Sequence, residues 1–267
     1  MTHFIFIILI IFLIYLFLIM PRYKTSPTWV RLSKYHYAHR GFHDHNAPEN
    51  TIAAFQLAID HNYGFELDIQ RTKDNELVVF HDFDLKRACN IDKKIADIDH
   101  DQLKELTIFN SDHHIPLFDD VLRLVHGQVP LIIEIKLPNN DTTTCELAAK
   151  MLDQYPGDFC IESFNPLAVK WFKINRPEWI RGQLAADFSK DDTKSFALSF
   201  ILENLLLNVV TRPDFVAFDV NELYMLSINI FHKILKGKTV LWTIRDKETF
   251  NRYQDKYDLF IFENFTI

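Results

Sequence analysis

The sequence GFELDIQRT at residues 64–72 alternates apolar and polar side chains, and its composition is typical of a β-strand. Successive side chains of a strand point to opposite faces, so Glu66 and Asp68, two residues apart, lie on the same face. Two carboxylates on one face offer oxygen ligands to a hard divalent cation such as Mg²⁺ or Ca²⁺. The segment therefore predicts both an element of the fold and part of a metal site.

Similar strand-like segments recur along the chain. With this first one included, they are expected at residues 35–39, 64–71, 130–136, 159–163, 180–184, 215–219, 239–244 and 259–263. Amphipathic helical stretches fill most of the intervals, among them 51–61, 141–154, 166–175, 221–236 and 247–256. Eight strands joined by helical crossovers predict an α/β fold, a closed parallel (β/α)8 TIM barrel of ordinary size.

A ninth apolar run, residues 77–80, follows the strand at 64–71 after a very short turn. A parallel return needs a crossover of about a dozen residues, so this run is expected to pair antiparallel, as a hairpin that carries His81. Residues of about 82–118 are rich in His, Asp and Lys and show no barrel unit. We interpret them as an insertion over the mouth of a barrel that occupies residues 35–267.

Functional groups of such barrels gather where the strands end. His39 and Arg40 end the first expected strand, and alternation places Glu134 and Lys136 on one face of LIIEIK, residues 131–136. Burying these charges is unfavourable unless they pair with each other or bind a ligand. A buried ion pair would explain Glu134 and Lys136 if they were considered alone.

Three carboxylates that converge without a cation would repel one another, whereas one divalent cation bound by Glu66, Asp68 and Glu134 removes the repulsion. Most of the twelve histidines are expected to be structural or exposed. His39 and His81 differ because each is expected at a strand end beside a charged residue. Trp242 is either part of the core or an apolar wall of the pocket, and we include it among the candidate substrate contacts.

The composition limits the classes of function. The chain has 267 residues, 48% of them hydrophobic, which suits one large folded domain or two small ones. A formal net charge of −7 disfavours nonspecific nucleic-acid binding, so no nucleic-acid partner is expected. The three cysteines form no C-x-x-C pair and indicate neither a disulfide framework nor a thiolate metal site. Nothing in the composition predicts an oligomeric state.

Residues 4–20 form an unbroken apolar run, about 25 Å long as a helix, which predicts a transmembrane anchor. A cleaved signal peptide is the alternative, but no Lys or Arg precedes the run and no A-x-A site follows it. Residues 21–34 are expected to be a juxtamembrane linker. The positive charge of this flank is at Arg22, Lys24, Arg31 and Lys34. The positive-inside rule therefore predicts a single-pass membrane protein whose folded domain is cytoplasmic.

Taken in order, the motifs of the chain resemble those of the glycerophosphodiester phosphodiesterase family. The matching motifs are HRG (39–41), PENT (48–51), ELD (66–68), TKD (72–74), VVFHD (78–82), EIK (134–136), ESF (162–164) and VLWT (240–243). The resemblance runs from about residue 35 to 245. Two departures are Asn75, where the family usually has glycine, and residues 257–264, which lack its usual Gly and Thr-Asp-x-Pro close.

The resemblance implies a TIM barrel that hydrolyses glycerophosphodiesters to an alcohol and sn-glycerol 3-phosphate with one divalent cation, Mg²⁺ or Ca²⁺. It gives the metal-ligand roles to Glu66, Asp68 and Glu134, the acid and base roles to His39 and His81, and the phosphate contacts to Arg40 and Lys136. A membrane anchor also makes lysophospholipase D-like hydrolysis of lysophospholipids an alternative. A second alternative is a non-catalytic barrel that binds phosphodiester head groups.

Overall fold

The computed structural model describes residues 2–24, 26–188 and 194–267. The described residues form one nine-stranded sheet, of which all but one strand pair in parallel. The parallel strands are β1 (Tyr37–Ala38), β2 (Gly64–Arg71), β4 (Leu131–Ile135), β5 (Phe159–Ser163), β6 (Arg181–Ala185), β7 (Phe215–Asp219), β8 (Lys238–Ile244) and β9 (Leu259–Phe262). They run in the order β1-β9-β8-β7-β6-β5-β4-β2, and pairing of β1 with β2 closes the barrel. The predicted closed TIM barrel is confirmed.

The remaining strand, β3 (Leu77–Val79), pairs antiparallel with β2, as the short turn between them predicts. In that turn Asn75 has a φ of 68°, the left-handed conformation that asparagine tolerates better than most residues. Asn75 therefore fills the place of a glycine without distorting the hairpin. The hairpin sets the position of His81, which follows β3.

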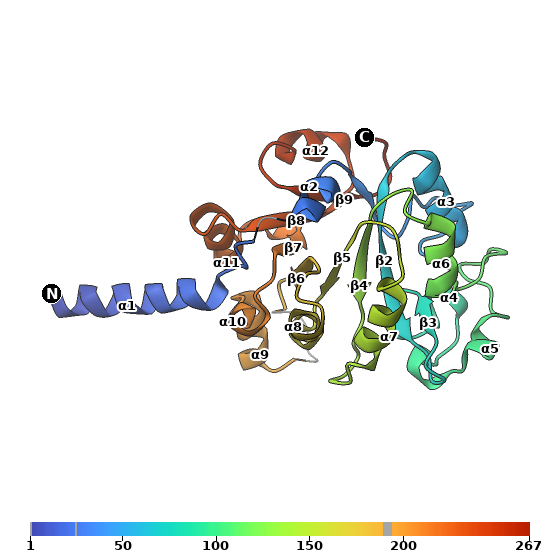
Figure 1. Cartoon of the computed structure of the whole chain (residues 1–267), viewed down its shortest axis with the longest axis horizontal. Coiled ribbons are helices and arrows are strands. Elements are labelled where there is room, and N and C mark those ends of the chain that lie inside the picture. Colours follow the sequence, from blue (N-terminus) through green and yellow to red (C-terminus); the bar gives the residue numbers. More distant parts are fainter. Residues whose placement is uncertain (1, 25, 189–193) are drawn as a thin grey trace.

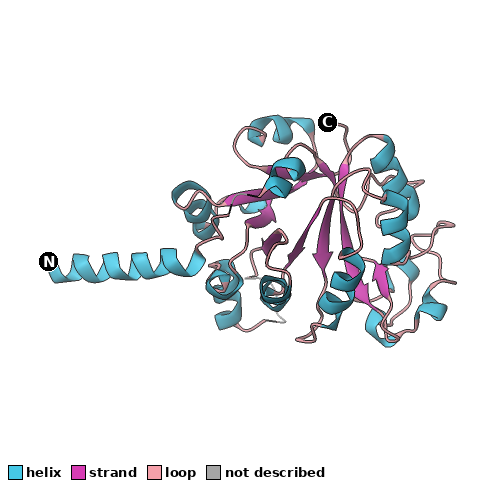
Figure 2. Cartoon of the chain, viewed as in Figure 1, coloured by secondary structure: helices cyan, strands magenta, loops and turns pink. Residues whose placement is uncertain are grey.

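Helices surround the barrel, as Figures 1 and 2 show. The main ones are α3 (Ile52–Asp60), α6 (Phe118–Val125), α7 (Thr143–Leu152), α8 (Pro166–Asn175), α9 (Phe196–Glu203), α10 (Asn208–Thr211) and α12 (Lys247–Tyr253). Thr51 caps α3 by accepting a hydrogen bond from the backbone N–H of Ala54 at 3.2 Å. The structure adds α6, α9 and α10 to the helices expected from the sequence.

The single helix expected at 221–236 is confirmed only in part. The structure has the 3-10 helix η2 (Val220–Glu222) and, after a turn, a continuous helical segment made of α11 (Leu226–Asn229) and the π-helical η3 (Ile230–Ile234). The side chain of Asp219 accepts from the backbone N–H of Asn221 at 2.7 Å, and the amide of Asn229 donates to the carbonyl of Leu223 at 2.7 Å. Such side-chain bonds to the backbone compete with regular helix, so the apolar periodicity alone is misleading.

The insertion at about 82–118 has its own small apolar core. It contains α4 (Lys86–Cys89), the 3-10 helix η1 (Ile95–Asp97) and α5 (His100–Leu103). Its buried residues include Leu85, Ile95 and Leu103, which pack with Val78 of β3. Figure 1 shows α4 and α5 beside β3 at one side of the barrel, so the insertion extends the hairpin.

The segment expected as a linker, residues 21–34, contains helix α2 (Pro27–Leu32). Trp29 and Leu32 of this helix are buried in a cluster with Tyr37 and Phe215, at the ends where the barrel strands begin. The Tyr37 hydroxyl donates to the carbonyl of Leu32 at 2.9 Å. Part of the expected linker therefore closes the bottom of the barrel.

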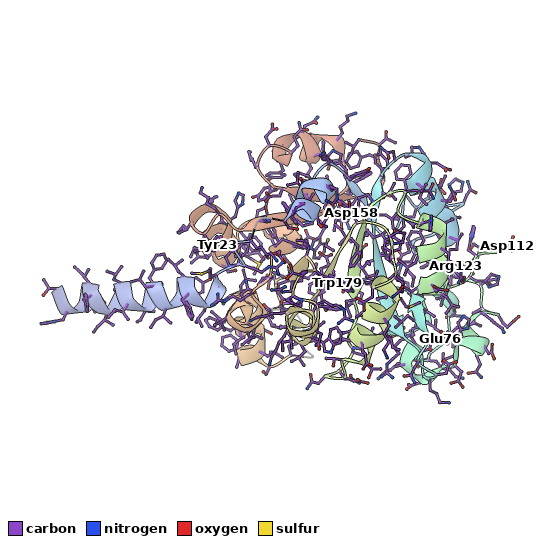
Figure 3. All side chains as sticks on the ribbon, viewed as in Figure 1. Tyr23, Glu76, Asp112, Arg123, Asp158 and Trp179 are labelled. Atoms are coloured by element: carbon purple, nitrogen blue, oxygen red, sulfur yellow. The ribbon has the colours of Figure 1, made fainter. Side chains whose placement is uncertain are left out.

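Helix α1 (Thr2–Ile19) projects away from the barrel, and its side chains point into open space along most of its length (Figures 1 and 3). Within the described residues it is the one helix long and apolar enough to cross a membrane, with a mean hydropathy of 2.9. A helix near the N-terminus with these properties is either an anchor or a signal sequence.

Candidate active site

Three buried carboxylates meet at the C-terminal ends of β2 and β4. Glu66 and Asp68 extend from β2, and Glu134 extends from the position of β4 that pairs with Asp68. All three side chains belong to buried residues, and each offers a ligand oxygen within 4.8 Å of the others. Strand alternation and register thus bring together the carboxylates that the sequence singled out.

Two cations lie against the carboxylates. The Nζ of Lys136 is 3.0 Å from an oxygen of Asp68 and 2.8 Å from an oxygen of Glu134. The Nε of Arg40 is 3.5 Å from Asp68, and the backbone N–H of Arg40 donates to Glu66 at 3.0 Å. The buried charges are therefore paired, which offsets much of the cost of their desolvation.

The carboxyl groups differ in their preference for a proton. Burial and the neighbouring Asp68 raise the pKa of Glu66 well above its ordinary value. Burial also raises the pKa of Glu134, although Lys136 opposes the change. For Asp68 the effect of burial is outweighed by Lys136, His81 and Arg40, which lower its pKa. Asp68 thus stays ionised. Glu66 and Glu134 tend to bind a proton, or a metal cation instead of a proton.

Glu162 adds a fourth carboxylate that was not among the predicted site residues. It occupies the position of β5 that pairs with Glu134, is 1% exposed, and has an oxygen without a hydrogen-bond partner among the described residues. Burial, followed by repulsion from Glu134, raises its pKa well above the ordinary value. The surplus of buried oxygen ligands fits a hard divalent cation at Glu66, Asp68 and Glu134.

His39 lies beside the carboxylates at the end of β1. Its Nδ1 is 2.6 Å from a carboxylate oxygen of Glu263, which follows β9, and Arg245 donates to the other oxygen of Glu263 at 2.8 Å. Burial lowers the pKa of His39, even though Glu263 opposes the change. The carboxylate orients the ring and leaves Nε2 for a reacting group.

His81 has an equivalent arrangement on the opposite flank, after β3. Its Nδ1 is 2.6 Å from an oxygen of Asp82, and Arg87 of α4 donates to the other oxygen of Asp82 at 2.6 Å. Burial lowers the pKa of His81, and Lys136 and Arg40 add to the effect. Both histidines therefore favour the neutral form, in which a ring nitrogen can accept a proton.

Ion pairs connect His81 to the phosphate-contact candidate Arg40. Arg87 donates to Glu49 at 2.6 Å as well as to Asp82, and the other partner of Glu49 is Arg40 at 2.8 Å. Asn50, next to Glu49, donates to Asp68 at 2.8 Å. The segment PENT at 48–51 thus does more than cap α3, since two of its side chains hold site residues.

Trp242, at the end of β8, is partly buried and packs edge-on against Phe164 with ring centroids 6.0 Å apart. Its indole nitrogen is buried without a hydrogen-bond partner among the described residues. A buried donor of this kind is unfavourable unless a ligand uses it. The residue lies on a different flank from the carboxylates of β2 and β4.

Several residues around the site were missed in the sequence. The sequence did contain a sign of Glu49 and Asn50: a helix cap needs only one polar side chain, and the segment PENT has three. Arg87 carried no signal beyond its charge. Glu263 stands 224 residues from His39, and its motif departs from the close expected there, so no local pattern pointed to it.

Comparison with known proteins identifies the family of this chain. The sequence profile of the "Glycerophosphoryl diester phosphodiesterase family" matches residues 39–255. The glycerophosphodiester phosphodiesterase of Bacillus altitudinis is 39% identical over 111 residues, which are 39% of this chain and 45% of that protein. The human lysophospholipase D GDPD1 is 36% identical over 122 residues, 41% of this chain and 38% of that protein. The chain thus matches about half the length of such relatives or less.

Solved structures share the fold over most of their length. A phosphodiesterase of Oleispira antarctica, solved with the product sn-glycerol-3-phosphate, superposes with a TM-score of 0.68 at 23% identity, over 86% of this chain and 92% of that one. The glycerophosphodiester phosphodiesterase of Thermotoga maritima superposes with a TM-score of 0.64 at 26% identity, over 85% and 92% of the two chains.

Proposed function

The chain belongs to the glycerophosphoryl diester phosphodiesterase family, and we propose that it hydrolyses glycerophosphodiesters to an alcohol and sn-glycerol 3-phosphate with the help of one divalent cation. The observation that carries the proposal is the meeting of three buried carboxylates with two cations and two carboxylate-supported histidines at one end of the barrel. Of the alternatives raised by the sequence, a non-catalytic barrel is disfavoured because every expected catalytic position is filled.

Glu66, Asp68 and Glu134 would hold the cation, because their oxygens converge within 4.8 Å. Bound there, Mg²⁺ or Ca²⁺ would act as a Lewis acid that offsets negative charge on the phosphoryl oxygens. Lys136 and Arg40 border the same carboxylates and supply further fixed positive charge. Such preorganised charge is most effective in a buried site, where water screens it little.

The two histidines carry the proton transfers. One accepts a proton from the attacking hydroxyl, whose oxygen forms the new bond to phosphorus. The other, in its protonated form, donates a proton to the oxygen of the departing alcohol as its bond to phosphorus breaks. With water as the attacking group, the products are an alcohol and a phosphomonoester. Glu263 and Asp82 hold the two rings through Nδ1, which keeps Nε2 available for these transfers. Trp242 would line the substrate pocket.

The proposal is tested by measuring hydrolysis of glycerophosphocholine through the amounts of choline and sn-glycerol 3-phosphate that are released. The wild type should lose activity in EDTA and regain it with Mg²⁺ or Ca²⁺. Glu66→Gln should lower kcat at least about a hundredfold. Glu76→Gln is a matched control, because Glu76 is an exposed glutamate in the β2–β3 turn (Figure 3). Undiminished turnover by Glu66→Gln, or in EDTA, would refute the metal assignment.

We also propose that α1 remains attached as a membrane anchor. The end of α1 is built into the barrel: Ile19 is fully buried, Asn208 donates to its carbonyl at 3.2 Å, and Arg212 donates to the carbonyl of Met20 at 3.0 Å. The next charged residue, Arg22, pairs with buried Asp214 at 2.7 Å. Cleavage near residue 20 would expose apolar surface and remove acceptors from Asn208 and Arg212.

The positive charge that follows α1 supports a cytoplasmic barrel as part of this proposal. Protease added outside intact cells should leave the barrel whole, and mature protein should retain residues 2–19 when its N-terminus is sequenced by mass spectrometry. If the external protease digests the barrel, the barrel lies outside the cytoplasm and the proposed orientation is wrong. A mature N-terminus beyond residue 19 would replace the anchor with a signal sequence.

A further inference from the structure

Two histidines and a glutamate converge on one flank of the candidate active site. Nδ1 of His39 is 2.6 Å from Oε2 of Glu263, and Nε2 of His43 is 3.7 Å from the same oxygen. One possible ligand atom from each of the three residues lies within 4.8 Å of the other two. Their side chains are 15%, 20% and 13% exposed, so the group is shielded but still open to an ion from solvent.

The turn that follows β1 fixes His43 beside Glu263. Gly41 in this turn has a φ of 83°, and a Cβ there would lie 2.8 Å from a side chain of α3, so the position requires glycine. The backbone N–H of Phe42 donates to a carbonyl of α3 at 3.0 Å, and its ring packs against Phe262 with ring centroids 6.2 Å apart. His43 follows Phe42 and Glu263 follows Phe262. Backbone contacts and aromatic packing therefore bring the two polar side chains together.

The spacing of the three side chains is close to that of a zinc site. The distance of 3.7 Å between His43 and Glu263 is too long for a hydrogen bond. In a tetrahedral zinc site with Zn–N bonds of about 2.0–2.1 Å, neighbouring ligand atoms stand about 3.3 Å apart. The separations of 2.6 and 3.7 Å lie on either side of that value, so small side-chain rotations produce the geometry. Two imidazoles and one glutamate, with water as the fourth ligand, are a donor set that zinc accepts.

This group and the three carboxylates differ in the metal that they prefer. Glu66, Asp68 and Glu134 offer oxygen ligands alone, which suit hard cations such as Mg²⁺ and Ca²⁺. Imidazole nitrogens suit Zn²⁺ better. Arg245 holds Oε1 of Glu263 at 2.8 Å and leaves Oε2, the oxygen that both histidines face, for a metal. Zinc can therefore bind beside the histidines without displacing the cation of the carboxylates.

We propose that His39, His43 and Glu263 form a second, inhibitory metal site that binds Zn²⁺. The proposal rests on the proposed function, because it assigns regulation to the same active site. Zn²⁺ takes the place of the proton on Nδ1 of His39, and that proton moves to Nε2 of the same ring. A neutral ring with zinc on Nδ1 and hydrogen on Nε2 has no lone pair to accept a proton, and it is a weaker acid than the imidazolium form. Zinc thus withdraws His39 from proton transfer, whichever of the two roles it has.

Inhibition by zinc at saturating Mg²⁺ tests the site in the full chain, purified in detergent micelles. Choline release from glycerophosphocholine is followed over a zinc titration, and each variant is compared with its own rate without zinc. His43→Asn should raise the zinc concentration that gives half inhibition at least about tenfold, because it removes a ligand. His45→Asn is the matched control, an exposed histidine of the same loop outside the cluster, and should stay within about twofold of wild type. A wild type that zinc does not inhibit, or equal inhibition of wild type and His43→Asn, would overturn the proposal.

Cobalt binding distinguishes this site from the carboxylate site and from hydrolysis itself. Co²⁺ substitutes for Zn²⁺, and its visible absorption is intense when it has four ligands. In Glu66→Gln, which lacks one ligand of the carboxylate site, Co²⁺ should give this absorption, Zn²⁺ should abolish it, and His43→Asn in the same chain should prevent it. Absorption that is missing from Glu66→Gln, or that survives the loss of His43, would contradict the zinc site. Absorption that depends on His43 in a protein that hydrolyses no glycerophosphodiester would support the zinc site and overturn the proposed function.

Discussion

The two flanks of the site hold their histidines in the same way but build the support differently. In each, a histidine Nδ1 contacts a carboxylate at 2.6 Å, and an arginine holds the other carboxylate oxygen: Glu263 with Arg245 for His39, and Asp82 with Arg87 for His81. Asp82 is the next residue after His81, whereas Glu263 is 224 residues from His39. The same electrostatic arrangement thus arises once from local sequence and once from barrel closure.

The flanks also differ in exposure. The side chains of His39 and Glu263 are 15% and 13% exposed, and those of His81 and Asp82 are 33% and 22% exposed. The first pair is held between two neighbouring barrel strands, and the second follows a hairpin strand outside the barrel. We therefore expect the His81 flank to adapt more readily when substrate binds, and the His39 flank to contribute more to stability.

The largest effects should come from the histidines themselves. His39→Ala and His81→Ala should each lower kcat by about 10² to 10⁴, the usual range for loss of a general acid or base. The relevant measurement is single-turnover hydrolysis of glycerophosphocholine with saturating metal. If the two roles are both required, the double variant should lose little more than the worse single variant. If either variant keeps the wild-type kcat, the histidine that it lacks takes no part in proton transfer.

Replacing the supporting carboxylates should have the next largest effect. Glu263→Gln and Asp82→Asn keep the shape but remove the charge that favours Nδ1–H, so each should lower kcat by about tenfold to a hundredfold while KM changes little. A merely structural role would leave the pH–rate profile unmoved. With the carboxylate charge gone, the protonated ring loses its stabilising partner and the pKa of its histidine falls. The acid limb should therefore shift to lower pH for the histidine that acts as base, and the alkaline limb for the histidine that acts as acid.

The arginines should distinguish the flanks. Arg87→Met removes the partner of both Asp82 and Glu49 and should lower kcat/KM by about tenfold, since Arg40 also loses its support. Arg245→Met removes an arginine that is 53% exposed and, among the described residues, forms an ion pair with Glu263 alone, so a change in kcat/KM below about threefold is expected. Equal losses of kcat/KM in the two variants would mean that the ion pairs of Glu49 with Arg40 and Arg87 do not contribute to activity.

The smallest effect concerns stability and its pH dependence. Burial acts to raise the pKa of Glu263, but His39, Arg245 and His43, whose Nε2 lies 3.7 Å from the carboxylate, lower it below the ordinary 4.5. Its ionised form therefore stabilises the fold above about pH 4.5, and this contribution is lost as the pH falls through the lowered value. At pH 7, Glu263→Gln should cost about 2 kcal/mol, or roughly 4–8 °C in Tm. Asp82→Asn should cost less.

Thermal unfolding at several pH values measures this difference. The gap in Tm between wild type and Glu263→Gln should narrow as the pH falls below about 4.5, because the Glu263 carboxyl of the unfolded wild-type chain is then protonated and ionisation contributes less to folding. A gap that stays constant with pH would assign the loss to packing of the amide rather than to the missing charge.

Much of the site was predictable because it depends on patterns within short segments. Glu66, Asp68, Glu134 and Lys136 follow from the two-residue period of β2 and β4, and the antiparallel hairpin follows from a turn too short for a crossover. The helix expected at 221–236 was only partly right for the opposite reason. Its apolar periodicity was present and residues 226–234 are helical, but between the 3-10 helix η2 and α11 the chain makes a turn, where the Asn229 side chain donates to the carbonyl of Leu223.

By itself, then, the sequence determined the barrel, the carboxylates and the two histidines, because side-chain alternation and strand-end position are properties of each segment alone. The tertiary structure alone decided that Glu263 supports His39 and that Glu49 joins Arg40 to Arg87. These contacts depend on closing β1 against β9 and on packing helices between strands. Closure of the barrel depends on how every strand aligns with its neighbours. A pattern within one short segment does not contain this information.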